Sequence, residues 1–247
     1  MATMAEPGTR LLRDVPLYSI TDAARFIGAR PVDVRRWVEG YSYLRDRVQP
    51  AVSQPAGRVA SGALYLTFHH LIEVWTIQRM RHPSDKVGKG IPLPQIRKAA
   101  EAARQIFETE FPLADERLRW DGAGIFYEVL GNQAVEGGLI ELSRRAGQTT
   151  WSKFIEDGLK RIEYQGRLAV RLWPLGHQHA IVLDPTLHDG WPTLARGKKL
   201  SGIPADVVAE MVEAGDPVER VAAAYEVPVA AVNDAVSFVA TWAEAAA

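Results

Sequence analysis

The chain has 247 residues, 47% of them hydrophobic and 24% charged, and this balance predicts a folded globular protein rather than a disordered one. It contains no cysteine, which excludes disulfides, thiolate metal sites and cysteine nucleophiles. No stretch approaches the roughly 18 consecutive apolar residues of a membrane helix, and the first residues do not form a signal peptide, so we expect a cytoplasmic protein with no membrane partner.

The two halves of the chain differ in charge, although the formal net charge of the whole is only −1. Residues 1–100 carry 15 Lys and Arg against 8 Asp and Glu, whereas residues 101–247 carry 14 against 22. In residues 201–247, Arg220 alone opposes eight carboxylates. A basic segment attracts the phosphates of nucleic acid and an acidic one is repelled by them, so we expect DNA at the first half and a protein partner at the far end.

The segment from Tyr18 to Gly40 predicts two short helices joined by a tight turn. Ser19 stands three residues before Asp22, which is typical of a helix start, and Gly28 is typical of a helix end. Pro31 suits the first turn of a second helix. Two short helices with such a turn form a helix-turn-helix, whose second helix can enter the major groove of DNA.

The second helix is expected to bury one side and to expose charge on the other. Its apolar residues recur at spacings of three and four, as a buried helix face requires. Arginine on the outer side can bind guanine or phosphate, while an ordinary helical hairpin with solvated charges remains the alternative from the pattern alone. The inward residues are Val34, Trp37 and Val38, and the outward ones are Asp33, Arg35 and Arg36.

A basic wing and two further helices are expected next. A loop rich in Pro and Gly leads into an alternating, strand-like run from Val59 to Leu66. A helix follows over about 67–80 and another begins at Leu93, both with apolar residues at helical spacing. The arginines that make the wing basic are Arg45, Arg47 and Arg58.

Four segments occur in this order between residues 17 and 110: SITDAARFIG, DVRRW, ALYLTFHHLIEV and IPLPQIRKA. Together they resemble the MerR-like winged helix-turn-helix family. The chain departs from metal-sensing members because it has no cysteine, and it lacks a long dimerising coiled coil after residue 110. A homodimer is expected because two copies of the DNA-binding segment would match the two half-sites of an operator. The resemblance implies DNA contacts by Arg30, Arg35, Arg36, Arg45, Arg47 and Arg58, with a partly structural role left open for Arg35. We assign Asp33, on the outer side of the same helix, to the DNA interface as well.

The middle of the chain predicts two β-hairpins. One turns at Asp121-Gly122 and the other at Gln165-Gly166, with alternating apolar residues on both sides of each turn. A short helix is expected between them over Thr150–Gly158. The second hairpin has a mixed-charge face, and such faces are usually solvated. Its charged residues are Arg161, Glu163, Arg167 and Arg171.

Near the end of the chain, a breaker-rich loop with short strands leads to three helices. Each helix begins with a proline, which suits the first helical turn. The three lengths predict a small bundle similar in outline to a homeodomain. The expected helices are Pro204–Ala214, Pro217–Tyr225 and Pro228 to about Trp242, the last with Val229, Val232, Val236, Val239 and Trp242 facing inward.

Five features of residues 180–243 keep a fixed order and spacing: I-V-x-D-P at 181–185, Gly190 with Pro192, RGKKL leading to IPADVV, AGDPVERVAAAYEV, and VNDAVSFVATW. They resemble a family of short domains found as antitoxins encoded beside PIN-like ribonuclease toxins. Where that family usually has Gly-Thr-Arg-Ile, this chain has Gly-Lys-Lys-Leu at 197–200. A MerR-like head followed by this tail resembles the VapB-type antitoxins of actinobacteria.

No enzyme motif is complete in the sequence. The histidines at 177, 179 and 188 lack the spacing of a zinc hydrolase, and Gly190 to Lys198 lacks the glycine spacing of a phosphate-binding loop. Asp184 and Asp189 are typical of turns. The sequence therefore predicts a protein that is not an enzyme and that has no cofactor or metal.

These observations predict an α+β, mainly helical fold with three domains: a winged helix-turn-helix over 1–111, a hairpin-rich region over 112–180 and a helical domain over 181–247. The expected function is an antitoxin that neutralises a PIN-like ribonuclease and represses its own operon. A free-standing MerR-like regulator that senses a small ligand is the alternative. As a hypothesis, the basic residues that reach the acidic metal site of the toxin are Arg196, Lys198 and Lys199.

Overall fold

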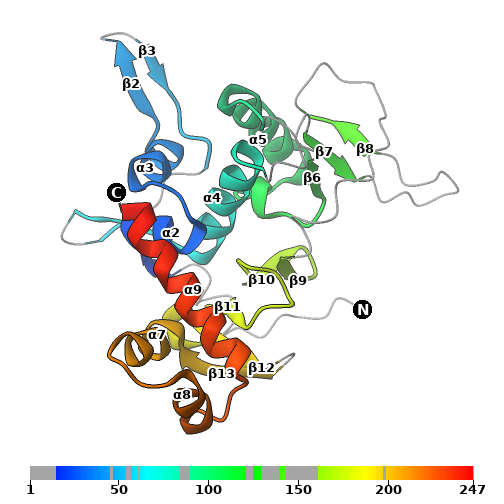
Figure 1. Ribbon diagram of the computed structural model, residues 1–247. Helices are drawn as coiled ribbons and strands as arrows, with labels where there is room; N and C mark the ends of the chain where they lie inside the picture. The colour runs from blue at the N-terminus through cyan, green and yellow to red at the C-terminus, as the bar shows by residue number, and fades with distance from the viewer. Residues whose placement is uncertain are drawn as a thin grey trace, which may run out of the picture.

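The computed structural model describes residues 15–44, 47–53, 57–59, 62–83, 90–120, 125–128, 139–142, 161–196 and 199–246. These residues form both helices and β-sheets, which confirms the α+β class (Figure 1). No helix among them is long and apolar enough to cross a membrane. The helices are α2 (Ile20–Ile27), α3 (Pro31–Glu39), α4 (Phe68–Arg81), α5 (Leu93–Phe107), α7 (Ala205–Glu213), α8 (Val218–Ala224) and α9 (Val229–Ala246), with short 3-10 turns η1 (Pro112–Ala114) and η2 (His188–Gly190).

The strands form four small antiparallel sheets. The orders are β1-β5-β4, β2-β3, β6-β7-β8 and β13-β12-β11-β10-β9. The strands are β1 (Tyr18–Ser19), β2 (Tyr41–Leu44), β3 (Arg47–Gln49), β4 (Gly57–Arg58), β5 (Leu64–Leu66), β6 (Leu118–Trp120), β7 (Ile125–Glu128), β8 (Leu139–Glu141), β9 (Ile162–Gln165), β10 (Leu168–Leu172), β11 (Ile181–Leu183), β12 (Pro192–Arg196) and β13 (Lys199–Pro204).

The predicted helix-turn-helix is present as α2 and α3. The Ser19 hydroxyl accepts a hydrogen bond from the Asp22 backbone N–H at 3.1 Å, which satisfies one of the free donors at the start of α2. Gly28 ends α2 in a left-handed conformation, and Pro31 occupies the first turn of α3. The local signals in the sequence therefore set both helix boundaries.

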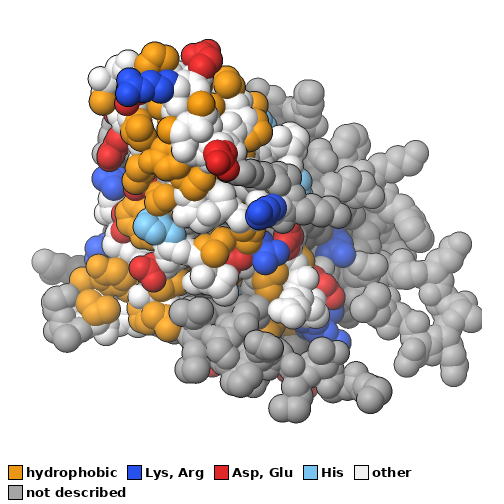
Figure 2. Space-filling view, turned by 90° about the horizontal axis from the view of Figure 1, so that it is seen from below, with side chains coloured by type: hydrophobic (Ala, Val, Ile, Leu, Met, Phe, Trp, Pro, Cys, Tyr) orange, Lys and Arg blue, Asp and Glu red, His pale blue; other side chains and the backbone are white. Residues whose placement is uncertain are grey.

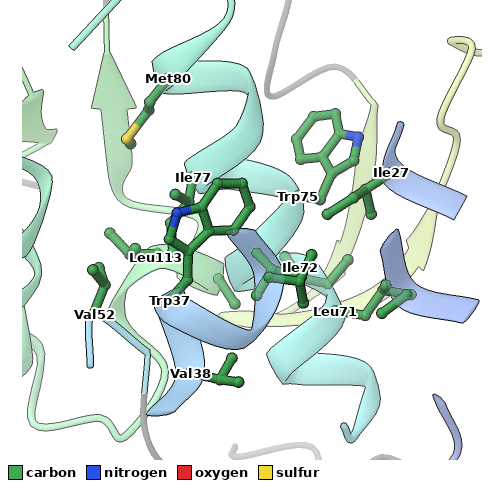
Figure 3. Close-up of a cluster of buried hydrophobic side chains, with 14 of the residues drawn as sticks. Ile27, Trp37, Val38, Val52, Leu71, Ile72, Trp75, Ile77, Met80 and Leu113 are labelled. Carbon is green, nitrogen blue, oxygen red and sulfur yellow. The ribbon is translucent and has the colours of Figure 1, made fainter. Parts of the chain in front are cut away.

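Helix α4 lies at the centre of the main core. Most of its side chains are buried, because helices, strands and the turn η1 surround it. Figure 3 shows Trp37 and Val38 of α3 together with Leu71 and Ile72 of α4 and Leu113 of η1 in one apolar cluster. Burial of Val34, Trp37 and Val38, as predicted, fixes α3 against α4 and leaves its other face to solvent.

The strand-like run from Val59 to Leu66 is not one strand. Instead β4 and β5 form a hairpin that reverses near Gly62, with Arg58 paired to Leu64. A second hairpin, β2-β3, follows directly after α3 and projects from the molecule at the top of Figure 1. The predicted wing is thus divided between two hairpins, because glycine and proline break the region into short extended pieces.

The two predicted middle hairpins are confirmed as β6-β7 and β9-β10. The expected helix at Thr150–Gly158 lies outside the described residues. The hairpin β9-β10 continues into β11, β12 and β13 as one five-stranded sheet. This sheet crosses the boundary predicted between residues 180 and 181, because Leu172 of β10 pairs with Leu183 of β11.

The three predicted C-terminal helices are confirmed as α7, α8 and α9, but the inward face of α9 differs from the predicted one. Val229 is 40% exposed, and Val236 and Val239 are only half-buried. The prediction is confirmed for Val232, which is fully buried, and for Trp242, which packs against the core, but it is wrong for the other three valines because alanines occupy much of the contact with α7 and α8. The stripe consists of Ala231, Val232, Ala235 and Phe238.

Helix α9 also packs against α2, so a helix near the start of the described chain lies beside the last one (Figure 1). The Phe26 ring lies 5.3 Å from the Trp191 ring and 5.4 Å from the Trp242 ring, between centroids. The buried Tyr18 hydroxyl donates a hydrogen bond to the Gly190 carbonyl at 3.1 Å. Trp242 contacts both main hydrophobic clusters, which join the N-terminal and C-terminal parts.

Candidate nucleic-acid interface

The outer face of α3 carries exposed arginines, as predicted. Between 50% and 67% of each side chain is exposed for Arg30, Arg35, Arg36 and the neighbouring Arg58 of β4. The opposite face of α3 is buried in the core, so these guanidinium groups are held on a fixed element. A rigid helix that presents arginine to solvent is suited to a DNA groove.

Asp33 lies between two of these arginines. Its carboxylate oxygens are 2.7 Å from the Arg30 Nε and 3.9 Å from an Arg36 nitrogen. The hydrogen bond from Arg30 and the attraction of Asp33 raise the pKa of the Arg30 guanidinium, which keeps it charged. Asp33, predicted at the DNA interface, therefore orients arginines rather than supplying an attractive charge of its own.

Glu39, at the other end of α3, also binds two arginines. It accepts a hydrogen bond from Arg35 at 3.4 Å and forms a close ion pair with Arg58. Arg58 also donates to the Gly62 carbonyl at 2.9 Å, which ties the β4-β5 hairpin to α3. Arg58 is thus brought to the interface, and Glu39 is a member that the sequence interpretation missed.

The ion pairs leave this face positive. Four arginines, at 30, 35, 36 and 58, share two carboxylates, at 33 and 39. Exposed pairs of this kind contribute about 0–1 kcal/mol, so an arginine can exchange its carboxylate for a phosphate at small cost. Arg36 has an additional support, since its guanidinium carbon lies 5.4 Å from the centroid of the Tyr41 ring.

Helix α5 anchors the β2-β3 hairpin beside α3. Arg97 donates to the Pro50 carbonyl and to the Gln49 side chain, both at 3.0 Å, and Arg104 donates to the Val52 carbonyl at 3.3 Å. The sequence did not identify these arginines, because only folding brings α5 to the hairpin. They fix the direction in which the projecting hairpin leaves the molecule.

The structure describes only some of the other basic residues that the sequence predicted at binding sites. Arg47 begins β3, so it belongs to the projecting hairpin, while Arg45 lies outside the described residues. Arg196 ends β12 and pairs in register with the exposed Lys199 of β13, and Lys198 lies outside the described residues. The β12-β13 hairpin is at the opposite end of the molecule from α3 (Figure 1). The structure therefore keeps the two predicted basic sites apart.

The histidines at 177 and 179 contact residues of the neighbouring segments and of α9. His179 Nδ1 lies 2.8 Å from the Asp234 carboxylate, which also accepts from the Ala180 N–H at 2.8 Å. The His177 ring instead stacks near Trp173. Among the described residues, no three His, Cys, Asp or Glu side chains are arranged to hold a metal ion. These contacts join α9 to the sheet.

Asp184 has the turn-forming role predicted for it and an additional ion pair. It accepts hydrogen bonds from the Thr186 N–H at 2.8 Å and the Thr186 hydroxyl at 2.6 Å. Arg171 lies 2.6 Å from Asp184 and 2.8 Å from Glu163. The predicted solvated charge on this hairpin face is therefore wrong for Arg171, because the sheet brings a nearly buried carboxylate beside it.

No family model matches the chain, and neither does any curated protein. Among solved structures, it is similar to the X-ray crystal structure of Rv2018 from Mycobacterium tuberculosis, with a TM-score of 0.63 and 18% sequence identity. The match covers 90% of this chain and 98% of that one. This chain therefore shares its fold, over nearly its whole length, with that mycobacterial protein.

Proposed function

We propose that the chain is an antitoxin that binds its own operator through the outer face of α3 and neutralises a PIN-like ribonuclease. The observation that carries the DNA part is the set of exposed arginines at 30, 35, 36 and 58, which outnumber their two carboxylate partners. Base edges and phosphates are both bound well by guanidinium groups. A homodimer would present two such faces to paired half-sites.

The toxin part of the proposal is supported by the C-terminal segment. Its order of motifs resembles antitoxin domains, and its surplus of carboxylates disfavours DNA there. Figure 2 shows hydrophobic side chains in several patches on the lower face of the molecule, with separate acidic and basic side chains between them. Val207 of α7 and Val229 of α9 are each 40% exposed. Such a mixed surface suits a protein partner.

A hypothesis within this proposal assigns the basic β12-β13 hairpin to the acidic metal site of the toxin. Arg196 and Lys199 stand opposite each other at its end, with Lys198 between them in sequence. Substitution of all three by Ser should weaken the complex without changing operator binding, because α3 lies at the other end of the molecule. Co-purification with the neighbouring toxin measures this, and an unchanged complex contradicts the hypothesis.

Operator binding tests the DNA part. Arg36→Ala is expected to weaken binding to the DNA upstream of its own gene by about 1–3 kcal/mol if the side chain contacts a base. Arg220→Ala, on the exposed surface of α8, is the matched control and should bind like the wild type. Fluorescence anisotropy at fixed salt measures both. Equal affinities for wild type and Arg36→Ala would place the DNA elsewhere.

Co-expression tests the toxin part. The gene beside this one should encode a small PIN-like ribonuclease that arrests growth when it is expressed alone, and this chain should relieve the arrest. A chain that binds its promoter but leaves the arrest unrelieved is a free-standing regulator instead. The toxin result is independent of the Arg36 result, so each half of the proposal can fail by itself.

A further inference from the structure

A cleft of about 630 Å³ lies between the N-terminal helices α2 to α4, here called the head, and the C-terminal part that ends in α9, here called the tail. Its lining comes from the α2-α3 turn with the adjoining ends of both helices, from the second half of α4, from the residue before β9, from the segment after β10 and from α9. Sites for small molecules usually measure about 300–1,000 Å³. The cleft is therefore large enough for one small organic molecule and far too small for a helix or a duplex.

The cleft is strongly basic. Among its described lining residues, Asp33 is the only carboxylate, and it is already engaged by Arg30 at the rim. Neither Arg79 nor Arg81 forms an ion pair with a carboxylate in the described part of the chain. The cationic lining side chains are Arg30, Arg79, Arg81 and Arg161, joined by the titratable His82.

Arg79 and Arg161 both line the cleft. Burial, and then the positive charge of Arg161, lower the pKa of Arg79. Arg161 is held in place by a hydrogen bond to the Pro174 carbonyl at 2.6 Å, and the Arg79 guanidinium carbon lies 6.0 Å from the centroid of the Trp75 ring. Burial of the Arg79 guanidinium disfavours its charged form, and an anion beside it would offset that cost.

Apolar side chains form much of the remaining wall. Phe26 and Ile27 come from α2, Trp75 from α4, Leu175 from the segment after β10, and Phe238 from α9. A bare phosphate or a DNA backbone would gain little from these side chains, whereas a flat ring would be removed from water by them. The combination of guanidinium groups with aromatic and aliphatic walls specifies an anion that carries a ring.

We propose that this cleft binds a small organic oxyanion, a carboxylate or phosphate ester with an aromatic or other flat ring. The guanidinium groups of Arg79 and Arg81 would bind the oxyanion, because arginine forms paired hydrogen bonds with such groups. The ring would lie against the apolar walls. The cleft shares Arg30 and Asp33 with the edge of the proposed DNA interface, but Arg79 and Arg81 belong to neither the DNA interface nor the toxin surface, and the site needs neither partner.

The position of the cleft gives its occupant a means to influence the head. The occupant would contact Gly28, Ala29 and Arg30, which lead into α3, and also Phe238 and Thr241 of α9. Gln78, another lining residue, donates to the Gly28 carbonyl at 2.8 Å and so supports the same turn. An effect of the ligand on operator binding rests on the proposed function, but ligand binding itself does not.

The test uses the full chain and the dye 1-anilinonaphthalene-8-sulfonate, which joins an anionic group to flat rings. Fluorescence titration should show saturable binding at one dye per chain. Arg79→Met and Arg81→Met, which keep most of the side-chain volume, should each weaken binding by about tenfold or more. Arg220→Met on α8 removes one exposed arginine and should leave binding unchanged.

Competition separates the anion from the ring. Phenyl phosphate or benzoate should displace the dye at millimolar concentration, and phenol should not. Circular dichroism of each variant establishes whether it is folded. If Arg79→Met does not fold, the test uses Arg81→Met alone. Dye binding that does not saturate, that is equal in wild type and the Arg79 and Arg81 variants, or that phenol displaces as well as the anions do, overturns the proposal.

Discussion

Two carboxylates orient the exposed arginines in and beside α3. Asp33 and Glu39 each bind two guanidinium groups, so all four arginines are oriented while half of their charge remains uncompensated. Such pairs hold side chains that would otherwise lose rotamer entropy on contact with DNA. The opposing residues therefore support the proposed interface more than they weaken it.

Glu73 is a carboxyl group buried inside the core of the head. The Ser53 hydroxyl and the Leu113 N–H, at 3.0 Å from Glu73 Oε1, donate hydrogen bonds to it. Burial raises the pKa of Glu73 from 4.5 to about 7, although these hydrogen bonds and Arg104 lower it in part. The group links α4 to the loop after β3 and to η1, and it keeps its proton well above the pH at which an exposed carboxyl group loses it.

Glu73 should make the stability of the fold depend on pH. Between pH 4.5 and about 7 the unfolded chain loses this proton while the folded one keeps it, so stability falls as pH rises through that window. Glu73→Gln should remove this fall, a difference on the order of 3 kcal/mol between pH 4.5 and pH 8. Urea unfolding at both pH values measures it.

The control for this experiment is Glu101→Gln, at an exposed position of α5. It should leave the pH dependence of the wild type intact. If Glu73→Gln has the same pH profile as the wild type, the carboxyl group at 73 does not have the raised pKa described here.

At the scale of elements, residues at the helix ends determine where each helix begins and ends. Individual hydrogen bonds and close contacts then hold the elements against one another. Arg97 and Arg104 of α5 fix the β2-β3 hairpin, and Gln78 of α4 fixes the helix-turn-helix turn. The turn η2 is fixed by Gly190, which has a φ of 78° and lies against the Tyr18 ring. Each of these contacts joins elements that are distant in sequence.

Gly190→Ala should disrupt the contact between η2 and β1. A Cβ atom at this position would lie 2.2 Å from the Tyr18 hydroxyl oxygen, and alanine is also strained at a positive φ. We expect a loss of about 2–3 kcal/mol in the free energy of unfolding. Chemical denaturation measures it, with Gly57→Ala as control, since a Cβ there meets nothing within 4 Å. Equal stability of the two variants would contradict this packing.

At the scale of the whole molecule, the head and the tail share one interior. The rings of Phe26, Trp191 and Trp242 bring α2, the segment after η2 and α9 together. The five-stranded sheet joins the second hairpin to the tail. A partner bound to the tail and DNA bound to the head would therefore act on connected parts of one structure.

This shared core should make unfolding cooperative. Thermal unfolding followed by far-ultraviolet circular dichroism and by tryptophan fluorescence should give coincident single transitions. Trp242→Ala should shift both transitions downward together, because a large aromatic side chain leaves the junction. Two separate transitions, with only the tail affected by Trp242→Ala, would show that head and tail fold independently.

The sequence by itself determined the local structure of this protein. Ser19, Gly28 and Pro31 mark helix ends through their own backbone geometry, and the residue pairs at 121–122 and 165–166 predicted the hairpins β6-β7 and β9-β10. These features need contacts only between near neighbours. The amphipathic pattern of α3 likewise identified its outer arginines, because helical spacing separates its two faces.

Contacts between residues that are distant in sequence were decided only by the tertiary structure. The buried stripe of α9, the ion pair of Arg171 with Asp184, and the bond from Tyr18 to Gly190 across 172 positions have no local signal. The basic cleft likewise takes its residues from parts of the chain as distant as α2 and α9. Such features follow from how helices and strands bury their apolar faces together, and sequence spacing does not encode that arrangement directly.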